Sequence, residues 1–167
     1  MKRTINKLFS VISVLIIFIS VVLLTVSIAP RFMGLKGYCV LTESMEPTIK
    51  KGSLVFAEKV SFDEIEIDNV LVFRDEGGDT GFTHRVTAID KEKKLITTKG
   101  DAGNTEDLYP TGYEYVAGRV VNKIPLLGYI TMFLNETYGK ITVAAVYVIW
   151  IAVAAEAHRA EKRRVSQ

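Results

Sequence analysis

An uncharged run of 22 residues near the N-terminus, from Leu8 to Ala29, most constrains how this chain can fold. As a helix it would reach roughly 33 Å, which is enough to cross the hydrocarbon core of a bilayer. The alternative is a cleavable signal peptide, because basic residues precede the run and Ser27-Ile28-Ala29 has the small-x-small form of a cleavage site. However, apolar cores of signal peptides have roughly 7 to 15 residues, and Pro30 would follow the cleaved bond without an N–H to offer. We therefore predict a retained transmembrane helix over residues 8–29.

A second apolar run, Ile141 to Ala155, is 15 residues long and would span only about 22 Å as a helix. Extending it back to Thr137 adds a tyrosine and a lysine suited to the membrane interface, and a basic segment follows on the other side. The alternative is a buried amphipathic helix, but the run is apolar all round. We predict a second transmembrane helix over residues 139–156.

The net charge of +2 conceals segments of opposite sign. The two ends carry seven basic and two acidic residues, whereas Arg31 to Lys140 carries 14 basic and 17 acidic residues. By the positive-inside rule, both termini are then cytoplasmic and the middle lies outside the cytoplasm. The predicted order is a cytoplasmic N-terminus (1–7), a transmembrane helix (8–29), an extracytoplasmic β-rich domain (30–138), a second transmembrane helix (139–156) and a basic cytoplasmic tail (157–167).

The middle domain has the pattern of a small β-sheet or β-barrel. Short β-prone runs alternate with turns rich in Gly, Asp or Lys, and helical periodicity is absent between them. The predicted strands cover residues 54–57, 70–73, 82–89, 95–98 and 115–121. We expect the acidic segment at residues 63–68 to be a solvated loop. The fold class is thus a mainly β domain with two flanking transmembrane helices.

The sequence contains few side chains that could take part in catalysis or bind a metal. A single cysteine rules out an intramolecular disulfide, and with only two histidines we expect no metal site and no cofactor. His158 lies in the basic tail, which leaves His84 as the imidazole of the external domain. In a strand, His84 shares a face with Phe82 and Val86, so it is either a general base or a core histidine bonded to a backbone carbonyl.

Two further segments of the middle domain offer reactive groups. Ser44-Met45-Glu46-Pro47 follows the first apolar run by about 15 residues and forms a turn, because Pro47 fixes φ. Lys99 to Asp107 follows a predicted strand and carries Asp101 and Asp107, either of which could orient an imidazole. The alternative for the first segment is an ordinary turn that happens to contain a serine. The alternatives for the second segment are an ordinary Gly-Asp turn and a calcium-binding loop, although the spacing of an EF-hand is absent.

The chain carries, in this order, a membrane anchor, Ser-Met-Glu-Pro, His-Arg-Val and Lys-Gly-Asp. With this ordered set of motifs it resembles the type I signal peptidases. The resemblance extends from about Val40 to Tyr129. The lysine-dependent bacterial branch of the family carries Lys-Arg-Val where this chain has His84-Arg85-Val86. The chain is therefore similar to the endoplasmic-reticulum and archaeal branch, also found in some Gram-positive bacteria.

This resemblance implies a Ser/His/Asp peptidase. Ser44 would be the nucleophile, His84 the general base, and Asp101 or Asp107 the carboxylate that orients it. The N–H of Ser44 and the hydroxyl of Thr42 would form the oxyanion hole. Val40 and Met45 would complete the substrate-binding residues. Most members carry Gly where this chain has Glu43, which puts the details of substrate fit in doubt.

The expected substrates are secretory preproteins that present a signal peptide at the outer surface of the cell membrane, or of the endoplasmic-reticulum membrane in a eukaryote. An extended peptide could add as a strand beside residues 40–42. We expect membrane lipid as a partner and no nucleic acid, and the sequence does not say whether accessory subunits are needed. The alternative is a catalytically inactive membrane-tethered β-domain that serves as a binding module.

Small residues recur at seven-residue spacing in both apolar runs. Ser13, Ser20 and Ser27 lie in the first run, and Ala145 and Ala152 lie in the second. These stripes permit close helix packing, or the serines simply bond to carbonyls of their own helix. The one cysteine, Cys39, is expected to be a buried apolar filler.

Overall fold

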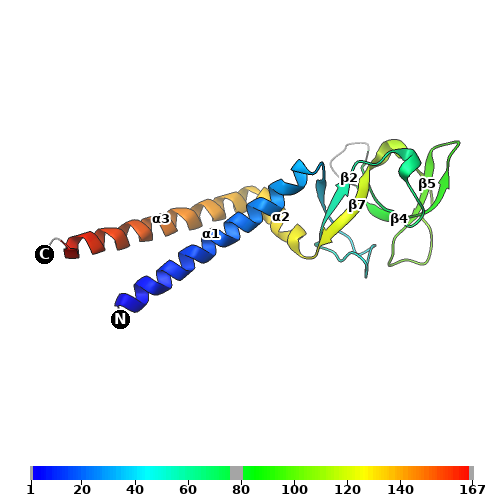
Figure 1. Ribbon diagram of the computed structural model, residues 1–167. Helices are drawn as coiled ribbons and strands as arrows, with labels where there is room; N and C mark the ends of the chain where they lie inside the picture. The colour runs from blue at the N-terminus through cyan, green and yellow to red at the C-terminus, as the bar shows by residue number, and fades with distance from the viewer. Residues whose placement is uncertain (1, 76–80, 166–167) are drawn as a thin grey trace. The chain divides into compact units, whose positions relative to one another are not determined.

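The computed structural model describes residues 2–75 and 81–165, with side chains described for residues 9–26, 28–75 and 81–156. The chain forms two units. One is helical and contains both ends of the chain, and the other spans Ala29 to Met132 and contains the strands (Figure 1).

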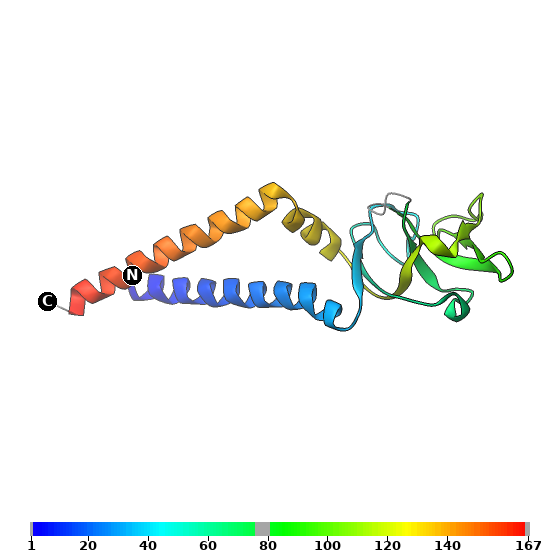
Figure 2. The ribbon, with the colours of Figure 1, turned by 90° about the horizontal axis from the view of Figure 1, so that it is seen from above.

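The helical unit contains two long apolar helices, α1 (Lys2–Phe32) and α3 (Thr137–Val165). Candidate membrane spans cover Phe9–Phe32 and Thr137–Glu156, with mean hydropathies of 3.0 and 1.7. Almost none of these residues is buried inside the protein, so apolar side chains face outward all round, as lipid contact requires. The first turns of α1 and the last turns of α3 lie at the same end of the unit (Figures 1 and 2).

Hydrogen bonds join α1 to α3. The indole N–H of Trp150 donates to Ser13 Oγ at 2.9 Å, and the hydroxyls of Ser20 and Tyr147 are also paired. Both serines bond in addition to carbonyls of their own helix. The interpretation that the serines bond to carbonyls of their own helix holds for Ser13 and Ser20, and their partners on the other helix are aromatic side chains rather than its alanines. The side chain of Ser27 lies outside the described residues.

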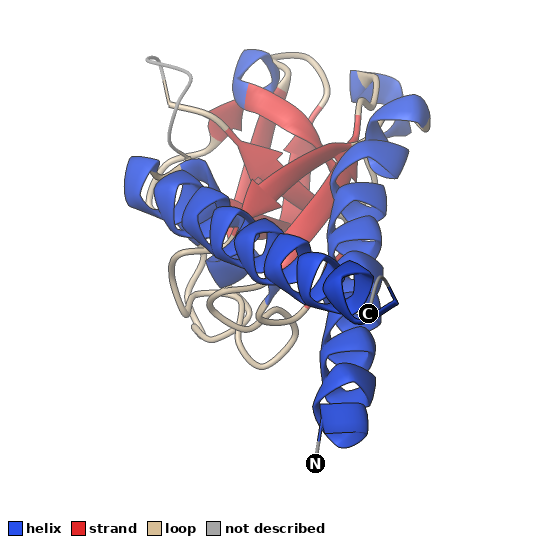
Figure 3. Cartoon of the chain, turned by 90° about the vertical axis from the view of Figure 1, so that its left-hand side faces the viewer, coloured by secondary structure: helices blue, strands red, loops and turns tan. Residues whose placement is uncertain are grey.

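The other unit is built on one antiparallel sheet, whose strands are drawn in red in Figure 3. Among the described residues it has seven strands in the order β1-β2-β7-β3-β4-β5-β6, and the sheet curls on itself (Figure 2). The strands are β1 (Lys36–Cys39), β2 (Leu54–Glu58), β3 (Val70–Phe73), β4 (Thr83–Asp90), β5 (Leu95–Lys99), β6 (Thr111–Gly112) and β7 (Val116–Ile124). Two 3-10 turns, η1 (Phe62–Glu64) and η2 (Tyr113–Tyr115), lie between them.

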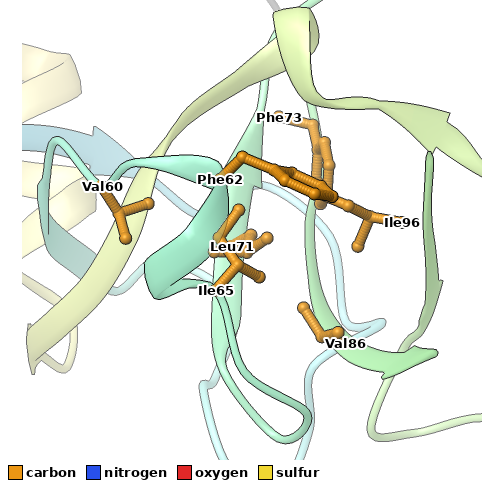
Figure 4. Packing of buried hydrophobic residues seen from close by; sticks show 7 residues of the cluster. All are labelled: Val60, Phe62, Ile65, Leu71, Phe73, Val86 and Ile96. Carbon is orange, nitrogen blue, oxygen red and sulfur yellow. The ribbon is translucent and has the colours of Figure 1, made fainter. Parts of the chain in front are cut away.

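Both faces of the sheet are covered, because successive side chains of a strand point to opposite faces. On one face, Leu71 and Phe73 pack in a first cluster that also contains Val60, Phe62, Ile65, Val86 and Ile96 (Figure 4). On the other face, Val72 packs in a second cluster with Val40, Met45, Ile49, Val55 and Ala57. The second cluster anchors the segment that carries Ser44.

The predicted fold class is confirmed: a mainly β domain accompanies two long apolar helices. All five predicted strands are present, with shifted ends. Helix α2 (Leu127–Asn135) lies after the last predicted strand, directly before α3, and was not predicted. Strands β1 and β6 were not predicted, and part of the expected acidic loop forms the turn η1.

Candidate active site

Ser44 lies in a turn that is fixed at both ends. The neighbouring Met45 side chain is fully buried in the second cluster, and its carbonyl accepts the N–H of Ile49 at 2.7 Å. The carbonyl of Ser44 accepts the N–H of Ala102 at 2.9 Å, which ties this turn to the segment after β5. Ser44 is half-buried, and its Oγ lies 3.1 Å from Thr42 Oγ1. The hydroxyl of Ser44 is therefore held at the surface of the domain by a rigid backbone.

His84 stands at the start of β4 with a carboxylate beside its ring. Its Nδ1 lies 2.7 Å from Asp107 Oδ2, and the same oxygen accepts the hydroxyl of the buried Thr98 at 2.5 Å. The Phe82 ring meets the imidazole edge to face, with centroids 5.1 Å apart. The side chain of His84 is 16% exposed and that of Asp107 28% exposed, so the pair is only partly shielded from water.

Gly100 brings the serine and the histidine together. A Cβ built at position 100 would lie 2.6 Å from the carbonyl oxygen of Ser44, 3.2 Å from its Cβ, and 3.2 Å from His84 Nε2. The glycine therefore touches both residues, and only a residue without a side chain fits between them without displacing one of them. The ring nitrogen that lies against Gly100 is Nε2, the one that does not bond to Asp107.

Asp101 is held by a different partner. Its two carboxylate oxygens accept Nε and Nη2 of Arg85 at 2.8 and 2.7 Å, and Nη1 of Arg85 bonds to the carbonyl of Asp68 at 2.8 Å. This bidentate pair holds the pKa of Asp101 below its ordinary value, with a smaller contribution from a hydrogen bond to Thr48. The pairing likewise raises the pKa of Arg85. The structure thus brings Asp107 to His84 and Asp101 to the arginine that follows it.

Of the remaining residues singled out in the sequence, two lie in the core. Met45 has no exposed surface, so its side chain cannot touch a substrate, and Val40 is 5% exposed. Glu43 points to solvent, with its side chain 70% exposed and 3.5 Å from Lys51 Nζ. Cys39 is half-buried, with its Sγ 3.6 Å from the carbonyl oxygen of Gly128.

A groove of about 270 Å³ is lined at one point by Thr42, whose hydroxyl contacts that of Ser44. Its walls are residues 38–42, residues 72–74 with 81–83, and Met132 of α2. The stacked rings of Phe73 and Phe82, with centroids 4.8 Å apart, form part of it. Thr42 joins the groove to Ser44, so the space could hold a peptide whose reacting bond lies at the nucleophile.

No sequence pattern singles out Thr98, Gly100 or Met132, although the Gly-Asp pair marks the turn that contains Gly100. Among the side chains described (residues 9–26, 28–75 and 81–156) there is no cluster of three His, Cys, Asp or Glu that could hold a metal ion. The chemistry available at this site is that of a hydroxyl, an imidazole and a carboxylate.

No family model matches the chain. The signal peptidase complex catalytic subunit SEC11C of Rattus norvegicus is 29% identical over 161 residues, which cover 88% of this chain and 81% of the relative. The Homo sapiens protein of the same name matches with the same figures. The catalytic subunit SEC11 of Metarhizium robertsii is 35% identical over 107 residues, 58% of this chain and 62% of the relative. Over most of its length the chain is therefore a homologue of SEC11 signal peptidase catalytic subunits, and its β domain holds Ser44 and His84 against Gly100 with Asp107 bonded to His84.

Proposed function

We propose that this protein is a membrane-bound serine endopeptidase that removes N-terminal signal peptides from secreted preproteins. The observation that carries the proposal is the convergence of Ser44, His84 and Asp107 from three separate segments, with Gly100 in contact with the first two and Asp107 bonded to His84. The names of the relatives support the choice of substrate.

In the proposed reaction, Ser44 Oγ leaves Thr42 Oγ1 and turns to His84 Nε2 as the peptide binds. The oxygen attacks the scissile carbonyl while Nε2 takes the hydroxyl proton. Asp107 accepts the Nδ1–H of His84, which keeps Nε2 free to act as the base and stabilises the imidazolium that forms. The imidazolium then gives its proton to the leaving amine, which leaves the signal peptide as an ester on Ser44. Water attacks this ester while His84 takes its proton, and the proton returns to Ser44 Oγ as the signal peptide departs as a carboxylate.

Negative charge on the tetrahedral intermediate needs donors beside the nucleophile. The N–H of Ser44 and the hydroxyl of Thr42 are the groups that we assign to this task. The support is the 3.1 Å separation of the two hydroxyl oxygens, which places Thr42 next to the reacting centre. Once Ser44 Oγ has attacked, the Thr42 hydroxyl is free to donate to the oxyanion.

The peptide would bind in the groove as an added strand. β1 is an edge strand. Just beyond it, Val40 donates its N–H to the carbonyl of Ser53 and accepts the N–H of Gly52. Backbone groups alternate in direction along an extended chain, so those of Leu41 point away from this pairing and toward the groove. Small side chains before the cleaved bond suit a space of about 270 Å³.

We also propose that both spans cross the membrane, with the two termini in the cytoplasm and the β domain on the opposite side. The segmental charges support this orientation, since basic residues concentrate at the two ends of the chain. Signal peptides would then meet Ser44 on the side where exported chains emerge.

The test is cleavage of a synthetic signal-peptide substrate by the purified protein in detergent. Ser44→Ala and His84→Ala should each lower kcat by about 10⁴-fold or more, because the nucleophile and the base act as a unit. Ser61→Ala is the matched control, since it removes a serine hydroxyl from the turn η1, and it should retain wild-type kcat.

Full activity of both the Ser44 and His84 variants would overturn the proposal and favour an inactive binding module. Cleavage by the purified chain alone would further show that it needs no additional subunit, although the relatives are named as subunits of a complex.

A further inference from the structure

Thr98, in β5, bonds to Asp107 through both its backbone and its side chain. Its carbonyl accepts the N–H of Asp107 at 2.8 Å, and its Oγ1 donates to Asp107 Oδ2 at 2.5 Å. Only 1% of Thr98 is exposed, so water does not compete for these groups. A single residue of the sheet therefore fixes both the backbone and the carboxylate of Asp107.

A hydroxyl is not what packing alone would favour at this position of the strand. Side chains alternate along β5, so Thr98 faces the same way as Ile96, which packs in the first cluster (Figure 4). Across the β4–β5 pair, Thr98 is opposite Val86, another member of that cluster. A buried hydroxyl must find a hydrogen-bond partner to offset its lost hydration, which a valine would not need. The partner that Thr98 finds is the carboxylate beside His84.

The Thr98 hydroxyl and His84 bind the same oxygen of that carboxylate. Asp107 Oδ2 lies 2.7 Å from His84 Nδ1 and accepts the Thr98 hydroxyl as well. The side chain of Asp107 is 28% exposed, so water reaches part of it. Without the hydroxyl, the carboxylate could rotate toward water and take Oδ2 away from the imidazole.

We propose that Thr98 is a positioning residue for the reaction, and that its hydroxyl acts by keeping Asp107 Oδ2 on His84 Nδ1. The inference rests on the proposed peptidase function and adds to it a residue that does not touch the substrate. When His84 takes the proton of Ser44, positive charge develops on the imidazole ring. A carboxylate that is already held in place stabilises this charge without having to reorient. The Thr98 hydroxyl therefore contributes to kcat through Asp107.

Two complementary variants separate the hydroxyl from the shape of the side chain. Thr98→Val keeps the branched shape and removes the hydroxyl, whereas Thr98→Ser keeps the hydroxyl and removes the methyl group. Thr98→Val should lower kcat by about 10- to 100-fold, the usual effect of losing one hydrogen bond to a charged group. KM should not change, because Thr98 is buried and is not a wall residue of the groove. Thr98→Ser should keep kcat within about threefold of wild type.

A double-mutant cycle shows whether Thr98 acts through Asp107. The effects of residues that act as a unit do not add, so Thr98→Val should lower kcat by no more than about twofold once Asp107→Ala has removed the carboxylate. Thr97→Val is the matched control, because it makes the same substitution on the opposite face of β5 and should retain wild-type kcat. Thr98→Ala, a second variant without the hydroxyl, should repeat the loss seen with Thr98→Val.

The experiment follows steady-state cleavage of a synthetic signal peptide by the full-length protein in detergent, with circular dichroism to check that each variant is folded. If wild type cleaves the peptide and both Thr98→Val and Thr98→Ala keep its kcat, the role of Thr98 is refuted and the peptidase function stands. If wild type does not cleave the peptide, the peptidase function itself fails and takes the positioning residue with it.

Three further outcomes would overturn the role of Thr98 alone. Equal losses in Thr98→Val and Thr98→Ser would assign the effect to packing. An undiminished loss in the Asp107→Ala background would show that Thr98 does not act through that carboxylate. A loss of the same size in Thr97→Val would assign the effect to β5 as a whole.

Discussion

Asp101 and Asp107 are chemically alike but hold different partners, so loss of charge should affect them differently. Asp107→Asn would present an amide to His84 Nδ1 and favour the wrong ring tautomer, with Nε2 no longer able to accept the serine proton. We expect kcat to fall by about 10³- to 10⁴-fold with little change in KM. Single-turnover kinetics on a synthetic signal peptide measure this loss, and a kcat within tenfold of wild type would remove Asp107 from the mechanism.

Asp101 should instead control stability in acid. Its folded-state pKa lies below the ordinary value of 3.8, because Arg85 bonds to the ionised form. The ionised carboxylate therefore stabilises the fold fully above about pH 3.8, and this contribution disappears as the pH falls through the lower folded-state pKa.

Asp101→Asn should lower the free energy of unfolding at neutral pH by about 1–3 kcal/mol, because Arg85 loses a charged partner. Between pH 5 and 2 the stability of the variant should fall less steeply than that of wild type. Urea unfolding followed by circular dichroism in detergent, across this pH range, tests both statements. If the free energy of unfolding depended on pH in the same way in wild type and in Asp101→Asn, the stabilising role of the ionised Asp101 would be contradicted.

The sequence could identify the serine and the histidine but could not choose between the two carboxylates. Both lie in one turn, and the choice depends on its backbone path. The N–H of Asp107 bonds to the carbonyl of Thr98 at 2.8 Å, which folds the end of the turn back beside β5 and the imidazole. Strand alternation did predict that His84 and Arg85 face opposite ways. The burial of Met45 was not predictable, because its direction is set by the turn that the second cluster anchors.

At the scale of elements, the two long helices are joined by side-chain hydrogen bonds that a fluorescence experiment can read. Trp150 is the one tryptophan of the chain, and its N–H donates to Ser13 Oγ. Ser13→Ala should move its emission to shorter wavelength and weaken the helix pair by about 0.6 kcal/mol, the usual strength of such a bond in a membrane. Ser10→Ala makes the same change at an exposed position of α1 and should alter neither quantity. Identical spectra for all three proteins would refute the pairing.

The sequence predicted the strands in which β-branched and aromatic residues are dense, and it missed the others for identifiable reasons. β1 reads Lys-Gly-Tyr-Cys and owes its conformation to pairing with β2. β6 has two residues, too few for any periodicity. The apolar run of α2 is nine residues long, and at that length neither a helix nor a strand can be told from pattern alone.

For the whole molecule, the charge distribution predicts a hairpin that exposes only the β domain outside the cytoplasm. In a Cys39→Ser background, Lys93→Cys places a thiol in the exposed turn between β4 and β5. A membrane-impermeant maleimide should label it in intact cells. A cysteine appended after the C-terminal residue should react only after permeabilisation. The reverse pattern would show that the chain is inserted the other way.

Gly100 closes one side of Ser44, the proposed nucleophile, and thereby restricts what could inhibit the enzyme. Its Cα stands against Ser44 and His84 Nε2, and a single added carbon already collides there. A covalent inhibitor must therefore approach along the groove, as an extended peptide mimic with its electrophile at the end. Substituents that branch toward the turn at residues 100–103 should abolish binding, whereas those that follow residues 38–42 stay within the groove.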